Sequence, residues 1–504
     1  MSQPTADTSI LDSLLARPEG GSFEVKRLKG GELSRCLQSL SAFANTNGGL
    51  LVLGLEDPKK ASGTDRIYGV EENPEALDEL RRQMQTLLTP RIQPPLAPEP
   101  VFHTIPCTLR TGNPGTLVCI QVHPSETLHS LVTGGTFVRF DRSNRQLNAR
   151  EIHERMLQLG QASVVDQPVD VPFELLDTHW WKDYRDARGL TRPLEEGLRS
   201  VGLAKKVGEA WKPTRLAVLL FAEFPSDLLG EKCAIRVFHY QGERIIHTGN
   251  TTNLLRPPRT VAGPLVHQIR EALRIVEEEL ASGVQVSPLG FEIVQRFPRR
   301  AIQETITNAV LHRDYRIPND IHIRLFSDRI EVESPGGLAY RIQVMDLGKV
   351  GSRPRNPSLV NQVREFPSPP NQDAGEGIPM MRDLMRKANL YPPIFVPLSA
   401  AEKDSLLVTL RNEVRASNWD QVAALLESHP TITNTQVREL LGTEDTLRVS
   451  KLLRGWVEMG LLEVANPEGA KQNRRYRKPG TAAEVDLFST TGGNEAEPES
   501  QDIE

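Results

Sequence analysis

The sequence has few of the features that mark a membrane-spanning, secreted or metal-binding protein. Its four cysteines stand at positions 36, 107, 119 and 233, and none forms a Cys-x-x-Cys pair. Neither a disulfide framework nor a zinc site is therefore expected. No run of about 18 apolar residues occurs, so we expect no transmembrane helix. The N-terminus has no basic start followed by an apolar stretch, which argues against a secretory signal and favours a cytoplasmic protein.

Two further absences limit the mechanism. The motif Gly-x-x-x-x-Gly-Lys-Ser/Thr does not occur, so a P-loop helicase motor is not supported. The net charge is -5, and nucleic-acid affinity would therefore need local basic patches rather than a global positive charge. With 38% hydrophobic and 25% charged residues, the 504-residue chain has the composition of a globular protein with several cores.

One stretch, QETITNAVLHRDY at 303–315, combines a helical apolar pattern with two polar residues. Ile302, Ile306 and Val310 repeat at helical spacing. Glu304 and Asn308 are four residues apart, so they lie on one face of that helix. A polar pair beside a packed face is either a solvated edge or the wall of a site, and the residues that follow favour the second.

The segment after this helix contains further parts of a nucleotide site. The run IHIRLFSDRIEVESPGGL at 321–338 predicts two strands joined by a hairpin. Two glycines at its end allow the backbone to approach a ligand closely. After a polar, Pro-rich stretch, GEG at 375–377 opens an apparent helix, and the free N–H groups of a helix N-terminus favour an anion.

The set ETITNAVLHRDY, ESPGGL, RNP and GEGIPMM resembles the GHKL ATPase superfamily, and most of all its branch of bacterial ATP-binding transcriptional regulators. The resemblance implies ATP and Mg²⁺ as cofactors. It implies that Glu304 orients the attacking water, that Asn308 ligates magnesium, and that residues of about 346–374 cover the ATP. The implied cofactor-binding residues are Asn308, Ser334, Gly336, Gly337, Gly375, Glu376 and Gly377.

The chain departs from that superfamily at one position. Ser334 stands where an aspartate usually accepts a hydrogen bond from the adenine amine. A hydroxyl can accept such a bond but lacks the charge-assisted strength of a carboxylate. Adenine selectivity and turnover are therefore left open, and so is the choice between ATP hydrolysis and ATP binding alone.

The N-terminal part has a second recognisable pattern. LSRCLQSLSAFANTNGG at 33–49 predicts a helix ended by a glycine turn, and a buried strand follows. With FEVKR before it and TFVRFDRSNRQLNAREI after it, the stretch resembles the Schlafen AlbA-type nucleic-acid-binding domain, which commonly precedes the GHKL branch in bacteria. The candidate phosphate contacts are Lys26, Arg27, Arg139, Arg142 and Arg145, with an ordinary solvated face as the alternative.

Some domains of this type cleave RNA with clustered carboxylates. Glu24, Glu56 and Asp57 are the candidates for a remnant of such a site. Two-metal cleavage needs several carboxylates converging on one point, and acidic residues beside a turn are usually just solvated. Nuclease activity is therefore not favoured, but it stays open.

The C-terminal part predicts three helices followed by a strand, a turn and a strand, and this spacing resembles the winged helix-turn-helix family. Thr446, Arg448 and Lys451 lie early on the third helix, where base edges are usually met. The predicted wing carries Lys471, Arg474, Arg475, Arg477 and Lys478. The alternative is a protein-interaction module. The residues after Gly480 include seven acidic residues and no Lys or Arg, which is typical of a disordered tail.

We therefore expect a multidomain α+β chain with an AlbA/Schlafen-like α/β domain, a GHKL-type α/β sandwich and a C-terminal winged helix-turn-helix. Within its middle part, RLAVLLFAEFP and CAIRVFHYQG are expected to form buried strands. The expected order is a flexible leader at 1–20, the Schlafen AlbA-type domain at 21–158, a connecting α/β segment at 159–258, the GHKL-type ATP-binding domain at 259–412, the winged helix-turn-helix at 413–480 and a disordered acidic tail at 481–504.

The expected function is that of an ATP-responsive DNA-binding protein, a transcriptional regulator. The alternative is an enzyme, either an ATPase or a nuclease that acts on nucleic acid in stress response or phage defence. Double-stranded DNA is the expected partner, and the resemblance implies a homodimer, since a symmetric dimer would fit a paired DNA site.

Overall fold

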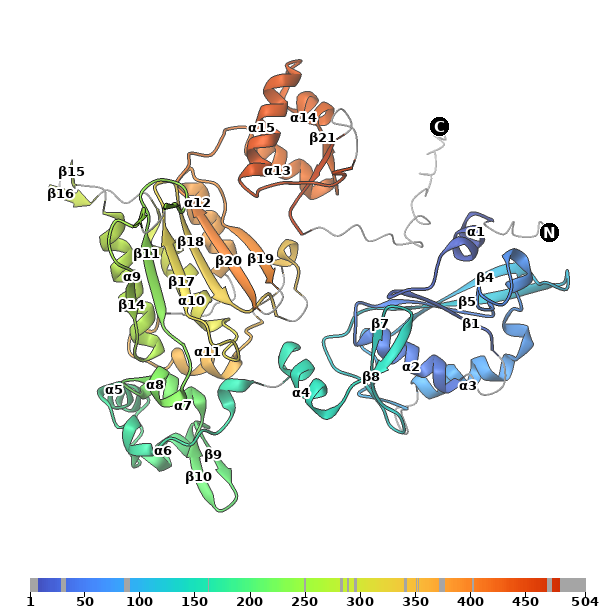
Figure 1. Ribbon diagram of the computed structural model, residues 1–504, viewed down its shortest axis with the longest axis horizontal. Helices are drawn as coiled ribbons and strands as arrows, with labels where there is room; N and C mark the ends of the chain where they lie inside the picture. Colours follow the sequence, from blue (N-terminus) through green and yellow to red (C-terminus); the bar gives the residue numbers. More distant parts are fainter. Residues whose placement is uncertain are drawn as a thin grey trace, which may run out of the picture. The chain divides into compact units, whose positions relative to one another are not determined.

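The computed structural model groups the described residues into two compact units, which lie within 8–161 and 163–480. The structure describes residues 8–28, 33–85, 91–161, 163–248, 251–281, 284–287, 290–293, 297–339, 342–349, 351, 353–370, 377–400, 403–468 and 474–480. The mixed α+β architecture expected from the sequence is confirmed (Figure 1).

The first unit contains two four-stranded sheets, in the orders β1-β2-β5-β4 and β3-β6-β7-β8. Its helices are α1 (Thr8–Ala16), α2 (Leu33–Ala44), α3 (Pro74–Gln85) and α4 (Ala149–Gln158). Its strands are β1 (Phe23–Lys26), β2 (Gly49–Leu53), β3 (Ile92–Gln93), β4 (Val101–Thr108), β5 (Pro114–Val122), β6 (Ser130–Leu131), β7 (Gly135–Phe140) and β8 (Ser143–Gln146).

Alternation along β2 places apolar residues on both faces of the first sheet. Leu51 and Leu53 pack in a core with α2, whereas Leu50 and Val52 pack on the opposite face with Leu14 of α1. Leu14 is fully buried, so residues Thr8–Ala16 of the expected leader form a packed helix. The nine residues have apolar positions three and four apart, so they form an amphipathic helix. Burial of Leu14 stabilises this helix against the sheet.

The second unit is built on a six-stranded sheet in the order β14-β11-β17-β18-β20-β19, in which β11 and β17 are parallel and the other neighbours antiparallel. The strands are β11 (Ile235–His239), β14 (Arg259–Val261), β17 (Ile321–Leu325), β18 (Arg329–Pro335), β19 (Ile394–Ala400) and β20 (Lys403–Arg411). Three helices, α9 (Leu265–Leu280), α10 (Arg299–Leu311) and α12 (Gly377–Lys387), pack on one face with α10 in the middle.

The expected connecting segment shares the core of this sheet. One cluster of buried residues runs from Val165 to Leu410 without a break between the segment and the sheet, and β11 and β14 belong to the same sheet. The remaining elements around it are α5 (His179–Ala187), α6 (Leu194–Ser200), α7 (Arg215–Phe221), α8 (Pro225–Leu229), α11 (Pro357–Val363), β9 (Ala204–Val207), β10 (Ala210–Pro213), β12 (His247–Thr248), β13 (Thr251–Thr252), β15 (Val284–Ser287) and β16 (Gly290–Ile293).

One predicted strand is wrong. The first seven residues of RLAVLLFAEFP form the helix α7, and its last residue, Pro225, begins α8. The hydroxyl of Thr214 accepts a hydrogen bond from the N–H of Ala217 at 3.2 Å and caps the first turn of α7. Every residue from Leu216 to Phe221 is buried. A continuous apolar run carries no periodicity, so a buried helix and a buried strand look alike in the sequence.

The C-terminal part of the second unit has three helices and a three-stranded sheet in the order β21-β23-β22. Its elements are α13 (Trp419–Ser428), β21 (Ile432–Thr433), α14 (Asn434–Leu441), α15 (Thr446–Glu458), β22 (Glu463–Val464) and β23 (Arg475–Arg477). We call these elements the C-terminal module. Tyr391, which lies between α12 and β19, is buried in the core of this module, and its hydroxyl accepts a hydrogen bond from Trp456 Nε1 at 3.3 Å.

Within the described residues, no helix is both long enough and apolar enough to cross a membrane.

Candidate nucleotide site

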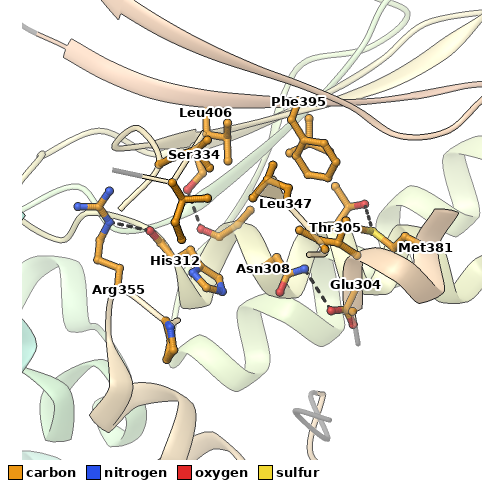
Figure 2. Close-up of a pocket in the computed structure, with 18 of the residues that line it drawn as sticks. Glu304, Thr305, Asn308, His312, Ser334, Leu347, Arg355, Met381, Phe395 and Leu406 are labelled. Carbon is orange, nitrogen blue, oxygen red and sulfur yellow. Dashed lines mark hydrogen bonds between the residues drawn. The ribbon is translucent and has the colours of Figure 1, made fainter. Parts of the chain in front are cut away.

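A cavity of about 340 Å³ lies between α10, α12 and the sheet of the second unit (Figure 2). It brings together six residues that the sequence placed in one site, although 73 positions separate the first from the last. These are Glu304, Asn308, Ser334, Gly336, Gly337 and Gly377. Gly375 and Glu376 lie outside the described residues, as does part of the expected cover at 346–374.

Glu304 and Asn308 face the cavity from successive turns of α10. Asn308 Nδ2 donates a hydrogen bond to Glu304 Oε1 at 3.1 Å. Because an ionised carboxylate only accepts hydrogen bonds, this contact fixes which end of the amide faces Glu304. The amide oxygen of Asn308 is therefore the end that does not contact Glu304. Amide oxygens are ligands that Mg²⁺ accepts.

Two glycines of the site are required by close approach. A Cβ at Gly377 would come within 2.0 Å of Glu304 Oε1, so the first turn of α12 lies directly against that carboxyl group. Gly336 has a φ of +98°, and a Cβ there would lie 2.6 Å from the Cβ of Asp314. Glycine is favoured at 377 because there is no space for a Cβ, and at 336 because the backbone is also left-handed.

The hydroxyl proton of Ser334 is used in a hydrogen bond within the protein. Its hydroxyl donates to the main-chain carbonyl of Ala309 at 2.7 Å, and the residue is buried at the wall of the cavity. The oxygen keeps lone pairs, so it can act toward a ligand only as an acceptor.

The other half of the cavity is apolar. Val332 of β18, Phe395 of β19 and Val408 of β20 line it from the sheet, and Ile342 and Leu347 line it from the segment after β18. A volume of this size with apolar walls and a few convergent polar groups is typical of sites for small molecules and cofactors. The polar residues of the cavity would suit phosphates with Mg²⁺. The apolar wall would suit the base of a nucleotide.

The residues HRDY that follow α10 mostly make contacts within the protein rather than with the cavity. The Arg313 guanidinium is buried and donates to the carbonyls of Lys232 at 2.5 Å and Asn319 at 2.7 Å. Tyr315 donates its hydroxyl to the carbonyl of Val310 at 3.0 Å, and burial raises its pKa. Of these four residues, His312 is the one that lines the cavity.

Asp314 is a buried carboxyl group held by two arginines. Burial would raise its pKa, but hydrogen bonds from Arg316 and the charge of Arg355 hold the pKa below its ordinary value. Arg355 Nη1 lies 3.3 Å from Asp314 Oδ2, so this carboxyl group stays ionised inside the protein.

Arg355 and Asn356 tie the end of α10 to the glycine turn, a role that we did not assign from the sequence. Arg355 donates to the carbonyls of His312 at 3.1 Å and Gly337 at 2.5 Å. Asn356 Nδ2 donates to the carbonyls of Leu311 and Arg313, both at 2.9 Å. The motif RNP was the available signal, because an asparagine before a proline cannot continue a helix and is free to cap a neighbouring one.

Three arginines also line the cavity and were not predicted. They are Arg300, Arg353 and Arg355, and the charge of Arg355 is paired with that of Asp314.

Most of the candidate phosphate contacts of the first unit are held in ion pairs, and one of them, Arg139, is buried. Arg139 has a side chain only 1% exposed, and it donates to Glu24 at 2.6 Å and to the carbonyl of Gly20. Lys26 pairs with the same glutamate at 2.7 Å. Arg27 pairs with Glu56 at 3.2 Å and more closely with Glu72. Because its side chain is buried, Arg139 is part of the interior and cannot reach a phosphate.

Two members of that set are exposed, Arg142 between β7 and β8 and Arg145 on β8. Arg145 pairs with Glu151 at 2.5 Å.

The AFANTNGG turn has a structural explanation. Asn45 is buried, donates to the carbonyls of His129 and Phe137 at 2.7 and 2.8 Å, and accepts from the His129 N–H at 2.8 Å.

Of the three acidic residues considered for a nuclease site, Glu24 and Glu56 are used in ion pairs, and Asp57 accepts a hydrogen bond from the main-chain N–H of Lys59 at 2.9 Å. Glu24 pairs with Lys26 and Arg139, and Glu56 with Arg27 and Lys60. In the part of the chain that the structure describes, no group of three or more Asp, Glu, His or Cys side chains is arranged to hold a metal ion.

In the C-terminal module, Thr446, Arg448 and Lys451 are exposed on the first turns of α15. Asp445 caps this helix by accepting from the Arg448 N–H at 2.9 Å. On and beside β23, Arg475 is exposed, Arg474 is partly exposed, Arg477 pairs with Glu463 at 2.6 Å, and Lys478 pairs with Glu427. Lys471 lies outside the described residues.

Comparison with known proteins gives two partial matches to protein families. Residues 319–410 match the family described as "Putative ATP-dependent DNA helicase recG C-terminal". Residues 19–148 match the family described as "Schlafen, AlbA_2". No curated protein matches the chain. Among solved structures, the DIP2311 protein from Corynebacterium diphtheriae is 18% identical, with 94% of this chain and 96% of that chain covered and a TM-score of 0.41.

Proposed function

We propose that the protein binds a magnesium nucleotide, ATP in the first place, in the cavity beside α10 and uses it to control the binding of DNA. The observation that carries the proposal is the cavity itself, in which a hydrogen-bonded Glu304–Asn308 pair faces Gly377 at the start of α12. The two family matches support a nucleic-acid-related ATPase as the broader class.

The residues of the cavity would divide the nucleotide between them. The Asn308 oxygen would hold Mg²⁺, the glycine turns at 336–337 and 377 would let the backbone approach the phosphates, and the apolar wall would take the base. When bound, Mg²⁺ neutralises phosphate charge. Ser334 would accept one hydrogen bond from the base, since its proton is already donated to Ala309.

The nucleic-acid part of the proposal rests on the C-terminal module. Its order of helices and strands suits a winged helix-turn-helix, with α15 in the major groove and the basic residues at 474–478 beside it. Duplex DNA would then be the partner, a homodimer would read a paired site, and the role would be that of a transcriptional regulator.

A second candidate is a nucleic-acid-dependent ATPase. Glu304 is 7% exposed and lies one helical turn from Asn308, which suits a general base that orients water beside a metal-bound phosphate. The pairing of Glu24 and Glu56 with basic residues gives a nuclease no comparable support.

Thermal melting with and without millimolar Mg-ATP tests the nucleotide site. A ligand at 100 times its Kd stabilises a protein by about 2.7 kcal/mol, which raises the melting temperature measurably. Asn308→Ala should remove most of the shift, while Gln303→Ala, on the same helix but outside the cavity wall, should keep it. The absence of a shift in the wild-type protein would rule out the proposal.

A further inference from the structure

Three residues of α10 line the cavity at intervals of four, and they are Arg300, Glu304 and Asn308. Residues four apart lie on one side of a helix. With a rise of about 1.5 Å per residue, neighbouring members of this row are about 6 Å apart along the helix axis. Glu304 and Asn308 have roles in the nucleotide site proposed above, whereas Arg300 has none so far.

The row has a direction relative to the proposed nucleotide. Its Asn308 end lies beside the base, because the next residue, Ala309, accepts the hydrogen bond from Ser334. Glu304 comes one turn earlier, and Arg300 comes one turn before Glu304. Arg300 is therefore the member of the row that is farthest from the base. In a nucleoside triphosphate, the part farthest from the base is the terminal phosphoryl group.

The charge of Arg300 is not neutralised by the residues that the structure describes. The neighbouring Arg299, which does not line the cavity, pairs with Glu277 at 2.5 Å. No hydrogen bond or ion pair joins the Arg300 guanidinium to another described residue, not even to Glu304 one turn away. Arg300 thus offers five N–H donors to an anionic ligand in the cavity.

The position of Arg300 brings no stability to the helix. It lies in the first turn of α10, which contains no acidic residue. A cation near the N-terminus of a helix opposes the helix dipole. Arg299 is compensated by its ion pair, but Arg300 is exposed and has no such partner among the described residues. A residue that costs stability at the wall of a cavity is more easily explained by a ligand than by the fold.

We propose that Arg300 binds the terminal phosphoryl group of the nucleotide and makes the site prefer a nucleoside triphosphate to a diphosphate. The inference rests on the nucleotide function proposed above. The planar guanidinium donates two parallel hydrogen bonds to oxygens of that phosphoryl group. A diphosphate ends before it reaches Arg300, so the guanidinium stays in solvent. The site therefore distinguishes the two states of the nucleotide.

The size of the preference follows from the exposure of Arg300. Hydrogen bonds between charged groups are stronger than those between neutral groups. The Arg300 side chain is exposed in the free protein, and solvent and salt screen part of the attraction. We therefore expect Arg300 to make the triphosphate bind about tenfold more tightly than the diphosphate, which corresponds to about 1.4 kcal/mol.

The experiment is a calorimetric titration of the full-length protein with Mg²⁺ and either ADP or a non-hydrolysable ATP analogue. Arg300→Ala should bind ADP as the wild type does and bind the analogue about tenfold more weakly. Arg300→Lys should keep part of the preference, because an ammonium group retains the charge but not the planar pair of donors. Arg299→Ala is the matched control, since it removes the same charge outside the cavity wall, and it should keep the wild-type preference.

Melting curves without nucleotide show whether the variants fold. Because Arg300 opposes the dipole of α10, Arg300→Ala should leave the melting temperature unchanged or raise it. Three results would refute the contact with the terminal phosphoryl group and leave the nucleotide function standing. They are an equal loss of affinity for both ligands in Arg300→Ala, an unchanged preference in that variant, and the same loss in Arg299→Ala. If the wild type binds neither ligand, both proposals fail together.

Discussion

Gly377 lies so close to Glu304 that a single added carbon would collide with the carboxyl group, since a Cβ at 377 would be 2.0 Å from Glu304 Oε1. The end of a glutamate side chain can move, so the collision would displace the carboxyl group rather than the helix. Asn308 would then lose the partner that fixes its amide. The start of α12 and the polar pair of α10 therefore form one arrangement.

Gly377→Ala is thus expected to impair the site without unfolding the protein. Alanine is favoured over glycine in a helix by about 1 kcal/mol, so thermal stability should stay the same or rise, while the melting shift caused by Mg-ATP should fall. Gly455→Ala in α15, where an added Cβ meets nothing within 4 Å, is the matched control and should keep the shift. A full shift in Gly377→Ala would contradict this geometry.

Glu304→Gln should separate binding from turnover. The amide keeps the size of the side chain but cannot take up a proton from water. Mg-ATP should still raise the melting temperature, and any release of phosphate should fall by at least tenfold, in line with the usual contribution of about 10²–10⁴ from a general base. Equal rates in the mutant and the wild type would show that Glu304 is not the base.

Asn356→Asp should destabilise the second unit. The aspartate has the same shape but cannot donate to the carbonyls of Leu311 and Arg313. Leaving buried polar groups without a partner costs about 1–3 kcal/mol. Urea unfolding should show this loss as a lower unfolding midpoint. An unchanged unfolding midpoint would mean that the end of α10 is held by other contacts.

Asp314 predicts a loss of stability in acid. Its pKa in the folded protein is lowered by Arg316 and Arg355 against the effect of burial, so its contribution is complete above the unfolded pKa of about 3.9 and is lost as the pH falls through the lower folded value. Asp314→Asn should be less stable at pH 7, and its stability should fall less than that of the wild type between pH 5 and strong acid. Parallel pH profiles would show that Asp314 does not titrate differently on folding.

The basic residues at 474–478 predict salt-dependent DNA binding. Neutralising Arg474, Arg475 and Arg477 should weaken binding to every sequence and reduce the salt slope by about 1 for each lost phosphate contact. Arg448→Ala or Lys451→Ala should instead change sequence preference by about 1–3 kcal/mol at one base pair if the contact is direct. Removal of the residues after Gly480 should strengthen binding if the acidic tail competes. An unaffected triple mutant would point to the first unit as the DNA-binding surface.

The residues of the site that follow from local patterns were predictable, and those that depend on distant partners were not. Glu304 and Asn308 share a face because of the pitch of a helix, and that is visible in the sequence. The role of Arg313 was not, because its partner Lys232 lies 81 residues away. Arg139 looks like a surface cation in the sequence, because its partner Glu24 comes 115 residues earlier and nothing local indicates the pair.

The same reason accounts for the differences in the fold. The apolar run of α7 has no period to distinguish a helix from a strand, and the cap at Thr214 is a single weak signal. The helix α1 within the expected leader is stabilised by burial against β1 and β2, and a short N-terminal sequence does not reveal whether such a surface exists.

Tyr391 has a consequence for how the chain can be divided. It precedes β19, yet its ring packs on Trp419 with centroids 5.9 Å apart and its hydroxyl accepts from Trp456. A fragment that begins at residue 413 would therefore carry an incomplete interior, with a gap where a large aromatic side chain belongs. The C-terminal module therefore cannot be transferred to another protein by cutting at its first helix, and a fragment that contains it would have to include Tyr391.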